Sequence, residues 1–469
     1  MGKQKLIAFV AYPGVSPLDL VGPLTVLRDL KLGTPYRTVV VAADTSMLPT
    51  DTPMGIVPAQ SFADVPNPFA VFVPGGGPAA VEAMRNEAVL EYVRMVGANA
   101  QIVGSTGNGA LVLGAAGLLR GRRVASHWAY RDLVESTGAV LTTDRWVDDG
   151  GVLTAAGGTA GIDAMLHLTE RLRGKSAARL AQLWMEYDPE PPFGRPDPAD
   201  PAGQLGAGLL ARPFGRPSEA ALSASSVRSA RKEIAVVLYP GVTALDLVGP
   251  LQVLAELERS IQGFRTVVVG ETLEPMGTDV GMSLVATNTF ADVPKPAVIV
   301  VPGGRAGTIR ALSDPAIRAY VRTAAASADV VASVCTGSLI LASVGLLDGR
   351  RAPTNWAFAS VLERLGGRYV RARWLHEGNL VMSAGVSAGI DMALYLASNL
   401  ADEAAAKRIQ QVIDYDPQPP GGRIDWRHLP LIARAARGAI SAAAPFIAVK
   451  PRLLTRADRR AGNVIGHAL

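Results

Sequence analysis

Cys335 is the single cysteine among 469 residues, and its surroundings suit a nucleophile. It follows the apolar run 330–334 and precedes a helical pattern that begins near Thr336. A strand-to-helix elbow lifts a side chain above the sheet edge, and the N–H groups of a helix start stabilise anions. We therefore predict a lowered thiol pKa and a nucleophilic thiolate. The alternative interpretation is a small buried residue. One cysteine excludes both a disulfide within the chain and a Cys-cluster metal site.

Asp246 is the second candidate for chemistry. It follows the predicted first strand of the same half of the chain, where a carboxyl would reach towards the elbow. A carboxyl beside a thiolate has a raised pKa, stays protonated and can donate a proton. The alternative interpretation is a capping box, in which Thr243 is the N-cap and Asp246 bonds back to its backbone. Spacing alone leaves both interpretations open.

The elements that must position these residues occur twice, at a spacing of about 228 residues. A repeat this long indicates two tandem copies of one domain and not a solenoid. The matched segments are 11–23 with 238–250, 61–66 with 289–294, 74–76 with 302–304, 157–163 with 385–391, and 186–189 with 414–417.

Within each copy, short Val/Ile-rich runs bounded by Gly or Pro alternate with helical patterns. This alternation predicts an open, doubly wound α/β domain with a mostly parallel sheet and helices on both faces. Its sites should lie outside the carboxyl ends of the strands. In the second copy the predicted strands are 234–238, 266–269, 298–301 and 330–333, and the predicted helices are 244–258, 315–326 and 338–344.

The repeat divides the chain into domains at 1–192 and 233–422, a linker at 193–232 rich in Pro, Gly and Ala, and a tail at 423–469. From Asp425 to the end the tail carries eight basic and two acidic residues, so the formal net charge of +5 belongs to it and does not indicate a nucleic-acid partner. We predict an amphipathic helix at 429–444 that ends before Pro445 and docks on its own domain. Contact with a membrane surface or a partner is the alternative.

The segments 239–250, 302–304 and 333–339 together resemble the ThiJ/PfpI family, which is class I glutamine amidotransferase-like, and within it the isonitrile hydratase branch. Residues 109–119 and 127–130 of the first copy resemble the same branch. The resemblance covers nearly all of both copies but neither the linker nor the tail. It implies two flavodoxin-like domains and a chemistry that needs no cofactor or metal.

The resemblance also implies roles for individual residues. Cys335 falls where the family has its nucleophile, and Asp246 where it has its acidic partner. Gly304 and Thr336 fall where backbone N–H groups stabilise an anionic adduct. The implied reaction is that of a hydro-lyase: the thiolate adds to an isonitrile, and water releases an N-substituted formamide from a covalent thioimidate. Thr336 also stands where other branches carry histidine, which argues against a Cys–His mechanism.

The first copy departs from this pattern at its own elbow. Gly107 occupies the position of the nucleophile, while Asp19 remains at the position of the acid. We therefore predict a degenerate, catalytically silent site in the first copy. His127 of the first copy is replaced by Asn355 in the second, and we interpret His127 as a helix N-terminal or core residue.

Three classes of function compete. The first is a Cys/Asp enzyme that hydrates an isonitrile or another small electrophile. The second is a ligand-sensing regulator, since related domains form the sensory half of some transcription regulators, although this tail is too short for a helix-turn-helix domain. The third is a redox or chaperone-like role for an oxidisable Cys335. We also expect the two copies to pack as an intrachain pseudo-dimer, and the chain to be cytoplasmic because it opens without a targeting segment.

Overall fold

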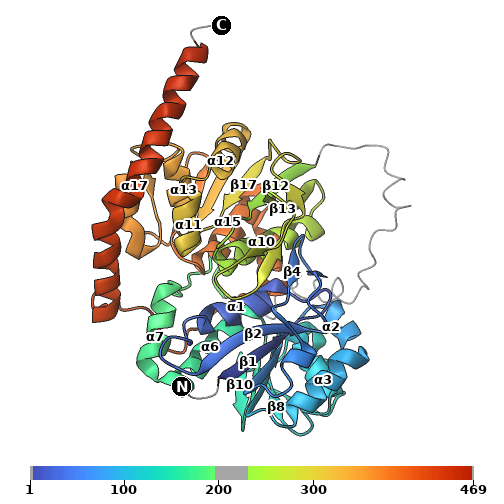
Figure 1. Cartoon of the computed structure of the whole chain (residues 1–469). Helices are drawn as coiled ribbons and strands as arrows, with labels where there is room; N and C mark the ends of the chain where they lie inside the picture. The colour runs from blue at the N-terminus through green and yellow to red at the C-terminus, as the bar shows by residue number, and fades with distance from the viewer. Residues whose placement is uncertain (1–3, 196–230, 467–469) are drawn as a thin grey trace, which may run out of the picture.

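The computed structural model describes residues 4–195 and 231–466, which form two α/β domains and a long C-terminal helix (Figure 1). Each domain is built on a seven-stranded sheet, so the predicted doubly wound α/β fold is confirmed. Residues 196–230, most of the predicted linker, lie outside the described residues.

The first sheet has the order β10-β11-β7-β6-β1-β2-β5. Its strands are parallel except for β10, which pairs antiparallel with β11 at one edge. Apart from the short edge strand β5, the parallel strands are mostly buried and apolar, as expected when helices cover both faces of a sheet. The strands are β1 (Lys5–Val10), β2 (Tyr36–Ala42), β5 (Gln60–Ser61), β6 (Ala70–Val73), β7 (Ile102–Thr106), β10 (Trp146–Asp149) and β11 (Val152–Ala155).

The second sheet repeats this order as β16-β13-β12-β17-β18-β22-β21. All four predicted strands are present, with ends shifted by no more than a few residues. The antiparallel edge strand was not predicted. The strands are β12 (Lys232–Val237), β13 (Phe264–Gly270), β16 (Asn288–Thr289), β17 (Val298–Val301), β18 (Val330–Val334), β21 (Trp374–Glu377) and β22 (Leu380–Ser383).

Helices cover both faces of each sheet. In the first domain they are α1 (Pro17–Leu27), α2 (Pro78–Ala83), α3 (Glu87–Gly97), α4 (Ala110–Ala115), α5 (Arg131–Glu135), α6 (Gly158–Arg173) and α7 (Lys175–Trp184). In the second they are α10 (Ala244–Ser260), α11 (Arg305–Ala311), α12 (Pro315–Ser327), α13 (Gly337–Ser343), α14 (Ala359–Arg364), α15 (Ala388–Leu400) and α16 (Glu403–Val412).

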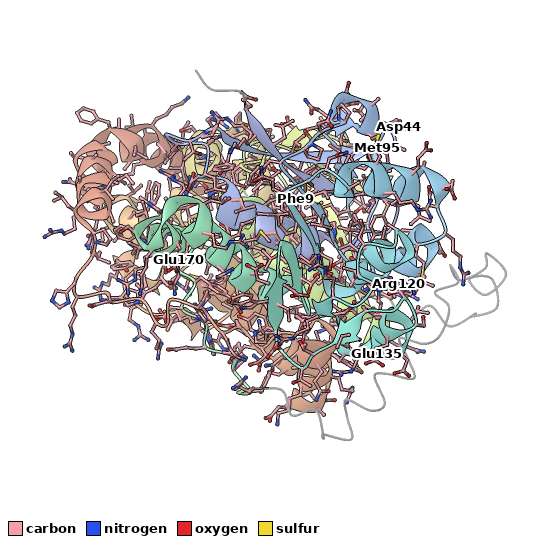
Figure 2. All side chains as sticks on the ribbon, turned by 90° about the horizontal axis from the view of Figure 1, so that it is seen from below. Phe9, Asp44, Met95, Arg120, Glu135 and Glu170 are labelled. Carbon is pink, nitrogen blue, oxygen red and sulfur yellow. The ribbon has the colours of Figure 1, made fainter. Side chains whose placement is uncertain are left out.

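The hydrophobic core is continuous across both domains. Phe9 of β1 lies inside it, whereas Asp44, Arg120 and Glu135 lie at the periphery (Figure 2). The amphipathic pattern of the sequence therefore sorts its residues between core and surface as expected.

The two domains pack as an intrachain pseudo-dimer. Helices α1 and α10 pack against each other between the two sheets (Figure 1). A separate four-stranded sheet joins the copies, because β4 (Gly55–Val57) pairs antiparallel with β15 (Ser283–Val285), with Ile56 opposite Leu284. Its outer strands are β3 (Leu48–Pro49) and β14 (Met276–Gly277).

The C-terminal helix α17 (Leu431–Gly466) packs along α13 and α14 of the second domain, so the predicted docking of the tail is confirmed. The predicted end before Pro445 is wrong, because the helix continues through Pro445 and Pro451. A proline inside a helix removes a backbone hydrogen bond. Ala444 and Ala448, on either side of Pro445, are buried and belong to the hydrophobic core, so this part of the helix is held against the domain.

The outer side of α17 carries large exposed apolar side chains beside exposed Arg and Lys residues. Leu431 is 74% exposed and Phe446 is 82% exposed. Within the described part of the chain, one helical stretch, Leu431–Thr455, has the length and composition of a membrane-crossing helix, and 17% of its apolar window is buried.

Candidate active site

Cys335 lies at the elbow between β18 and α13, as predicted, with a φ of 56°. This left-handed backbone costs a non-glycine residue roughly 1–3 kcal/mol. Three other segments hold it there. The Cys335 N–H donates to the Ser383 carbonyl at 3.0 Å, and the Cys335 carbonyl accepts bonds from the hydroxyls of Ser338 (3.1 Å) and Thr354 (3.2 Å). Strain that is held so firmly is typical of a functional position.

Asp246 lies in the first turn of α10 and is completely buried. Its Oδ2 accepts a bond from the Gly303 N–H at 3.2 Å, and its carboxyl lies close enough to Cys335 to raise the pKa of the thiol. The capping-box interpretation is wrong, because the Thr243 side chain makes no capping bond. The Asp279 carboxylate caps α10 instead, accepting from the Ala244 N–H at 3.0 Å. Asp246 is therefore free to face the elbow.

Burial controls the protonation of this pair. It raises the pKa of Asp246 to about 8, helped by the negative charge of Asp279, so the raised carboxyl pKa is confirmed. Burial also raises the pKa of the Cys335 thiol, and the carboxyls of Asp246 and Glu186 raise it further. The predicted lowering is wrong, because a single N–H bond from Thr336 opposes the loss of solvent. At neutral pH the site holds a thiol beside a carboxylic acid.

The predicted anion-binding groups lie next to this pair. The Gly304 N–H donates to the Thr336 Oγ1 at 3.1 Å, while the Thr336 N–H points to the sulfur. A buried hydroxyl chain continues from Thr336 to Thr308 (2.9 Å) and Tyr239 (3.1 Å), whose hydroxyl donates to a backbone carbonyl. The Thr336 N–H therefore faces the sulfur. That the N–H groups of Gly304 and Thr336 stabilise an anionic adduct stays a prediction.

The first domain supplies Glu186 to this site. Glu186 is buried, has a φ of 47°, and its carboxylate accepts a bond from the Trp356 N–H at 2.8 Å. Its carbonyl accepts bonds from Arg373 (3.3 Å) and from the Ser387 hydroxyl (3.2 Å). Burial raises the pKa of Glu186 to about 7. Sequence reasoning missed this residue, although its segment 186–189 recurs as 414–417.

A second cross-domain contact, between Arg28 and Asp279, acts on the helix that carries Asp246. Arg28 of the first domain is buried and forms an ion pair with Asp279, the residue that caps α10. The positive charge of Arg28 lowers the pKa of Asp246 in opposition to its burial. The site in the second domain is therefore assembled from both halves of the chain.

The DJ-1/PfpI family model matches residues 5–171 and 232–399. The chain belongs to the DJ-1/PfpI family. Both matches contain the elbow and the acidic residue of their copy. The ThiJ/PfpI resemblance is thus confirmed for both domains.

Relatives within this family differ in role. An isonitrile hydratase from Pseudomonas putida is 42% identical over 188 residues, which are 40% of this chain and 80% of that enzyme. The HTH-type transcriptional regulator CdhR from Pseudomonas aeruginosa is 30% identical over 181 residues, 36% of this chain and 51% of the regulator. A ThiJ/PfpI family protein from Pseudomonas syringae, known from its crystal structure, is 31% identical in sequence. The matched region is 52% of this chain and 98% of that protein, with a TM-score of 0.43.

The first DJ-1/PfpI domain keeps the elbow without the nucleophile. Gly107 has a φ of 57°, the same backbone conformation as Cys335. A Cβ atom added at Gly107 would lie 2.6 Å from the Asp19 Oδ2, so the carboxyl occupies the space that a cysteine side chain would need. Burial raises the pKa of Asp19 to about 8. The geometry agrees with the predicted degenerate site, whose silence stays a prediction.

His127 and Asn355 play the same structural part in their domains. The His127 Nδ1 accepts from the Ala129 N–H at 3.3 Å, and the Asn355 Oδ1 accepts from the Ala357 N–H at 3.2 Å. Each side chain thereby caps a short 3-10 helix. The interpretation of His127 as a helix N-terminal residue is confirmed. Among the described residues, no group of three or more His, Cys, Asp or Glu side chains has the geometry of a metal site.

Proposed function

We propose that the second domain hydrates an isonitrile, or a similarly small electrophile, with Cys335 as nucleophile and Asp246 as proton-transfer partner. The placement of a buried carboxyl near a thiol at a strained elbow carries this proposal. The 42% identity with an isonitrile hydratase supports the choice of substrate class.

The resting protonation of the pair sets the order of steps. The carboxylate form of Asp246 takes the thiol proton, and the sulfur attacks the terminal isonitrile carbon to form the C–S bond. The Asp246 acid then gives this proton to the same carbon, which yields a thioimidate. Water adds to the thioimidate carbon and loses one proton to the Asp246 carboxylate. That proton passes to the nitrogen, the C–S bond breaks, and the second water proton returns to the sulfur. The net change is addition of one water to give an N-substituted formamide.

This order of steps has a pH dependence. The reaction starts from ionised Asp246, whose pKa is about 8, so the fraction of competent enzyme grows between pH 7 and pH 9. Initial rates with a neutral isonitrile should rise about tenfold per pH unit below pH 8 and level off above it. A rate that falls over this interval would contradict the role of Asp246 as initial base.

The decisive experiment is turnover of cyclohexyl isocyanide by the full chain, followed as N-cyclohexylformamide by mass spectrometry. We expect Cys335→Ala to abolish product, and Asp246→Asn to reduce the rate by at least 100-fold, within the range of general acid–base catalysis. Asp292→Asn, which changes an exposed carboxylate of the same domain, is the control and should retain full activity. Equal product from wild-type and Cys335→Ala would overturn the proposal.

A ligand-sensing role is the second candidate, favoured by the 30% identity with CdhR. A sensor would bind an isonitrile or another small molecule at Cys335 without releasing a formamide. The third candidate, a redox role, requires oxidation of Cys335, a residue that is only 7% exposed. Mass spectrometry after mild peroxide treatment, beside the turnover assay, separates these alternatives.

A further inference from the structure

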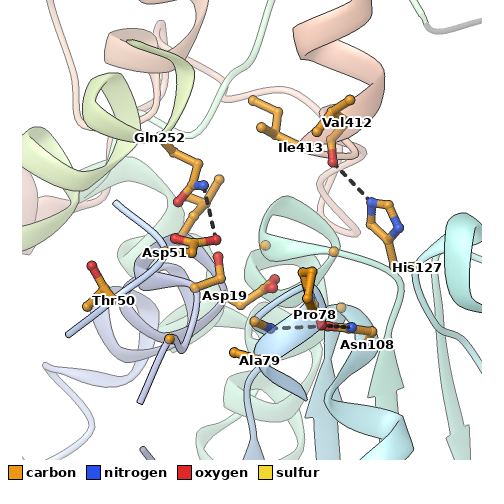
Figure 3. A pocket seen from close by; sticks show the side chains of 18 of the residues that line it. Asp19, Thr50, Asp51, Pro78, Ala79, Asn108, His127, Gln252, Val412 and Ile413 are labelled. Carbon is orange, nitrogen blue, oxygen red and sulfur yellow. Dashed lines mark hydrogen bonds between the residues drawn. The ribbon is translucent and has the colours of Figure 1, made fainter. Parts of the chain in front are cut away.

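The degenerate elbow of the first domain opens into a cavity of about 420 Å³. This volume lies within the range of small-molecule sites. Asp19 and Asp51 point into one space beneath Gln252, with Val412 and Ile413 opposite (Figure 3). Gln252 and the two apolar residues belong to the second domain. The cavity is therefore built by both domains.

Four oxygen atoms around this cavity are buried and lack a hydrogen-bond partner. They belong to Asp19 (Oδ1), Asp51 (Oδ1), Gln252 (Oε1) and Tyr130 (Oη). Gln252 is only 4% exposed, and its amide nitrogen already donates to Asp51 at 3.4 Å. Proteins rarely leave several buried acceptors unsatisfied in one place. The arrangement points to a ligand that brings hydrogen-bond donors.

The charge of the lining is also one-sided. Carboxyls of Asp19, Asp51, Glu82 and Glu256 line the cavity, and the cation among its lining residues is Arg259. Arg259 is already paired with Glu256 on the same helix, α10. Both ring nitrogens of His127 already have backbone partners, the Ala129 N–H at Nδ1 (3.3 Å) and the Val412 carbonyl at Nε2 (3.0 Å).

We propose that the first domain binds a small organic cation with N–H donors, such as a primary ammonium or guanidinium compound, in this cavity. The cation would donate to the unpartnered oxygens of Asp19, Asp51 and Gln252. The absence of a metal-like cluster among the described residues favours an organic ion over a metal ion. This site does not depend on the reaction proposed for the second domain.

The raised pKa values of Asp19 and Asp51 agree with a site whose cation is absent. Burial raises the pKa of Asp51 to about 7, where the positive charge of Arg259 opposes it and Glu256 adds to it. Burial raises the pKa of Asp19 to about 8, and the charges of Asp51 and Asp414 raise it further. The titratable or charged groups that face them are Glu82, Glu256, Asp414, Arg259, His127, Tyr12 and Tyr130. A bound cation would reverse the destabilisation of the carboxylates, so binding at pH 7 should release protons.

Isothermal titration calorimetry on the full chain tests this proposal. The probes are methylguanidinium and 1,4-diaminobutane, with glycerol and acetate as neutral and anionic controls. We expect the cations to bind at least tenfold more tightly at pH 8.5 than at pH 6, and to release protons when two buffers of different ionisation enthalpy are compared. Absence of cation binding, or equal binding of glycerol, would overturn the proposal.

Variants locate the binding. Asp19→Asn and Asp51→Asn should each weaken cation binding by tenfold or more, and Gln252→Leu by a smaller factor. Asp292→Asn changes an exposed residue that does not line the cavity, and this variant should bind like wild-type. Circular dichroism confirms folding of each variant, and two independent carboxyl variants guard against one that fails to fold. Cation binding that survives both carboxyl substitutions in folded protein would refute this site.

Discussion

Glu186 accepts a hydrogen bond from the backbone N–H of Trp356 at 2.8 Å, across the boundary between the two domains. Asp414, its counterpart in the second copy, reaches in the opposite direction, where its carbonyl accepts a bond from the Thr159 hydroxyl at 3.0 Å. The pseudo-dimer therefore exchanges equivalent residues. Each elbow is completed by the other domain, which gives the copy without a cysteine a role at the elbow that has one.

The first prediction concerns the charge of Glu186 beside the thiol. Its carboxylate raises the pKa of Cys335, so Glu186→Gln should lower that pKa by roughly one unit. The measurement is the rate of Cys335 alkylation by iodoacetamide as a function of pH. Glu190→Gln changes a neighbouring acid that pairs with Arg423 at the surface, and it should leave the profile unchanged. An unchanged profile in Glu186→Gln would show that the carboxylate does not act on the sulfur.

A second prediction concerns the buried ion pair between Arg28 and Asp279. Arg28→Met leaves the Asp279 carboxylate without its partner, and removing one member of a buried pair costs about 3–5 kcal/mol. Urea unfolding should show this loss. Adding Asp279→Asn should restore at least half of it, since the amide oxygen can still cap α10.

The control for this pair lies at the surface. Arg94 pairs with Glu87 at 3.1 Å in an exposed position, and Arg94→Met should cost less than about 1 kcal/mol. If Arg28→Met and Arg94→Met had equal effects, the cross-domain pair would contribute nothing to holding the domains together.

Local patterns predicted the parts of the site that lie on one element. The apolar run before Cys335 and the helical pattern after it predicted the elbow, and the repeat predicted that Gly107 stands at the equivalent position, where its backbone has the same conformation. The spacing between Thr243 and Asp246 predicted a helix start, which is present at Ala244. These features depend on neighbours in sequence, so periodicity and turn chemistry were sufficient.

The remaining features depend on how the domains pack. Glu186 meets Trp356 across 170 residues of sequence, and the joining strands β4 and β15 are three residues each. No local pattern carries such contacts. The thiol pKa was predicted in the wrong direction for a related reason, because burial of Cys335 comes from the whole fold and outweighs the bond from Thr336.

A third prediction uses the empty elbow. Gly107→Ala places a methyl group 2.6 Å from the Asp19 Oδ2 and forces a positive φ on alanine. We expect the free energy of unfolding to fall by about 3 kcal/mol, from left-handed strain and from the clash. Gly117→Ala separates the two effects, since Gly117 also has a positive φ, of 80°, but nothing within 4 Å of an added Cβ. Its loss should be about 1 kcal/mol. Equal losses would show that Asp19 moves aside freely.

A final prediction follows from the protonation of Asp19. Its folded-state pKa, about 8, is above the ordinary value of 3.8, so the folded protein holds this proton more tightly than the unfolded chain. The stabilisation is complete below about pH 4 and is lost as the pH rises through 8, with a slope of at most about 1.4 kcal/mol per pH unit for one carboxyl. Asp19→Asn removes the titration, so its stability relative to wild-type should increase steadily between pH 5 and pH 8. Urea unfolding at several pH values measures this difference.

Asp64→Asn is the matched control, because bonds from Ser61 lower the pKa of this exposed carboxyl and place its titration below the interval. A difference between Asp19→Asn and wild-type that is as flat as that of the control would mean that Asp19 is already ionised in the folded protein.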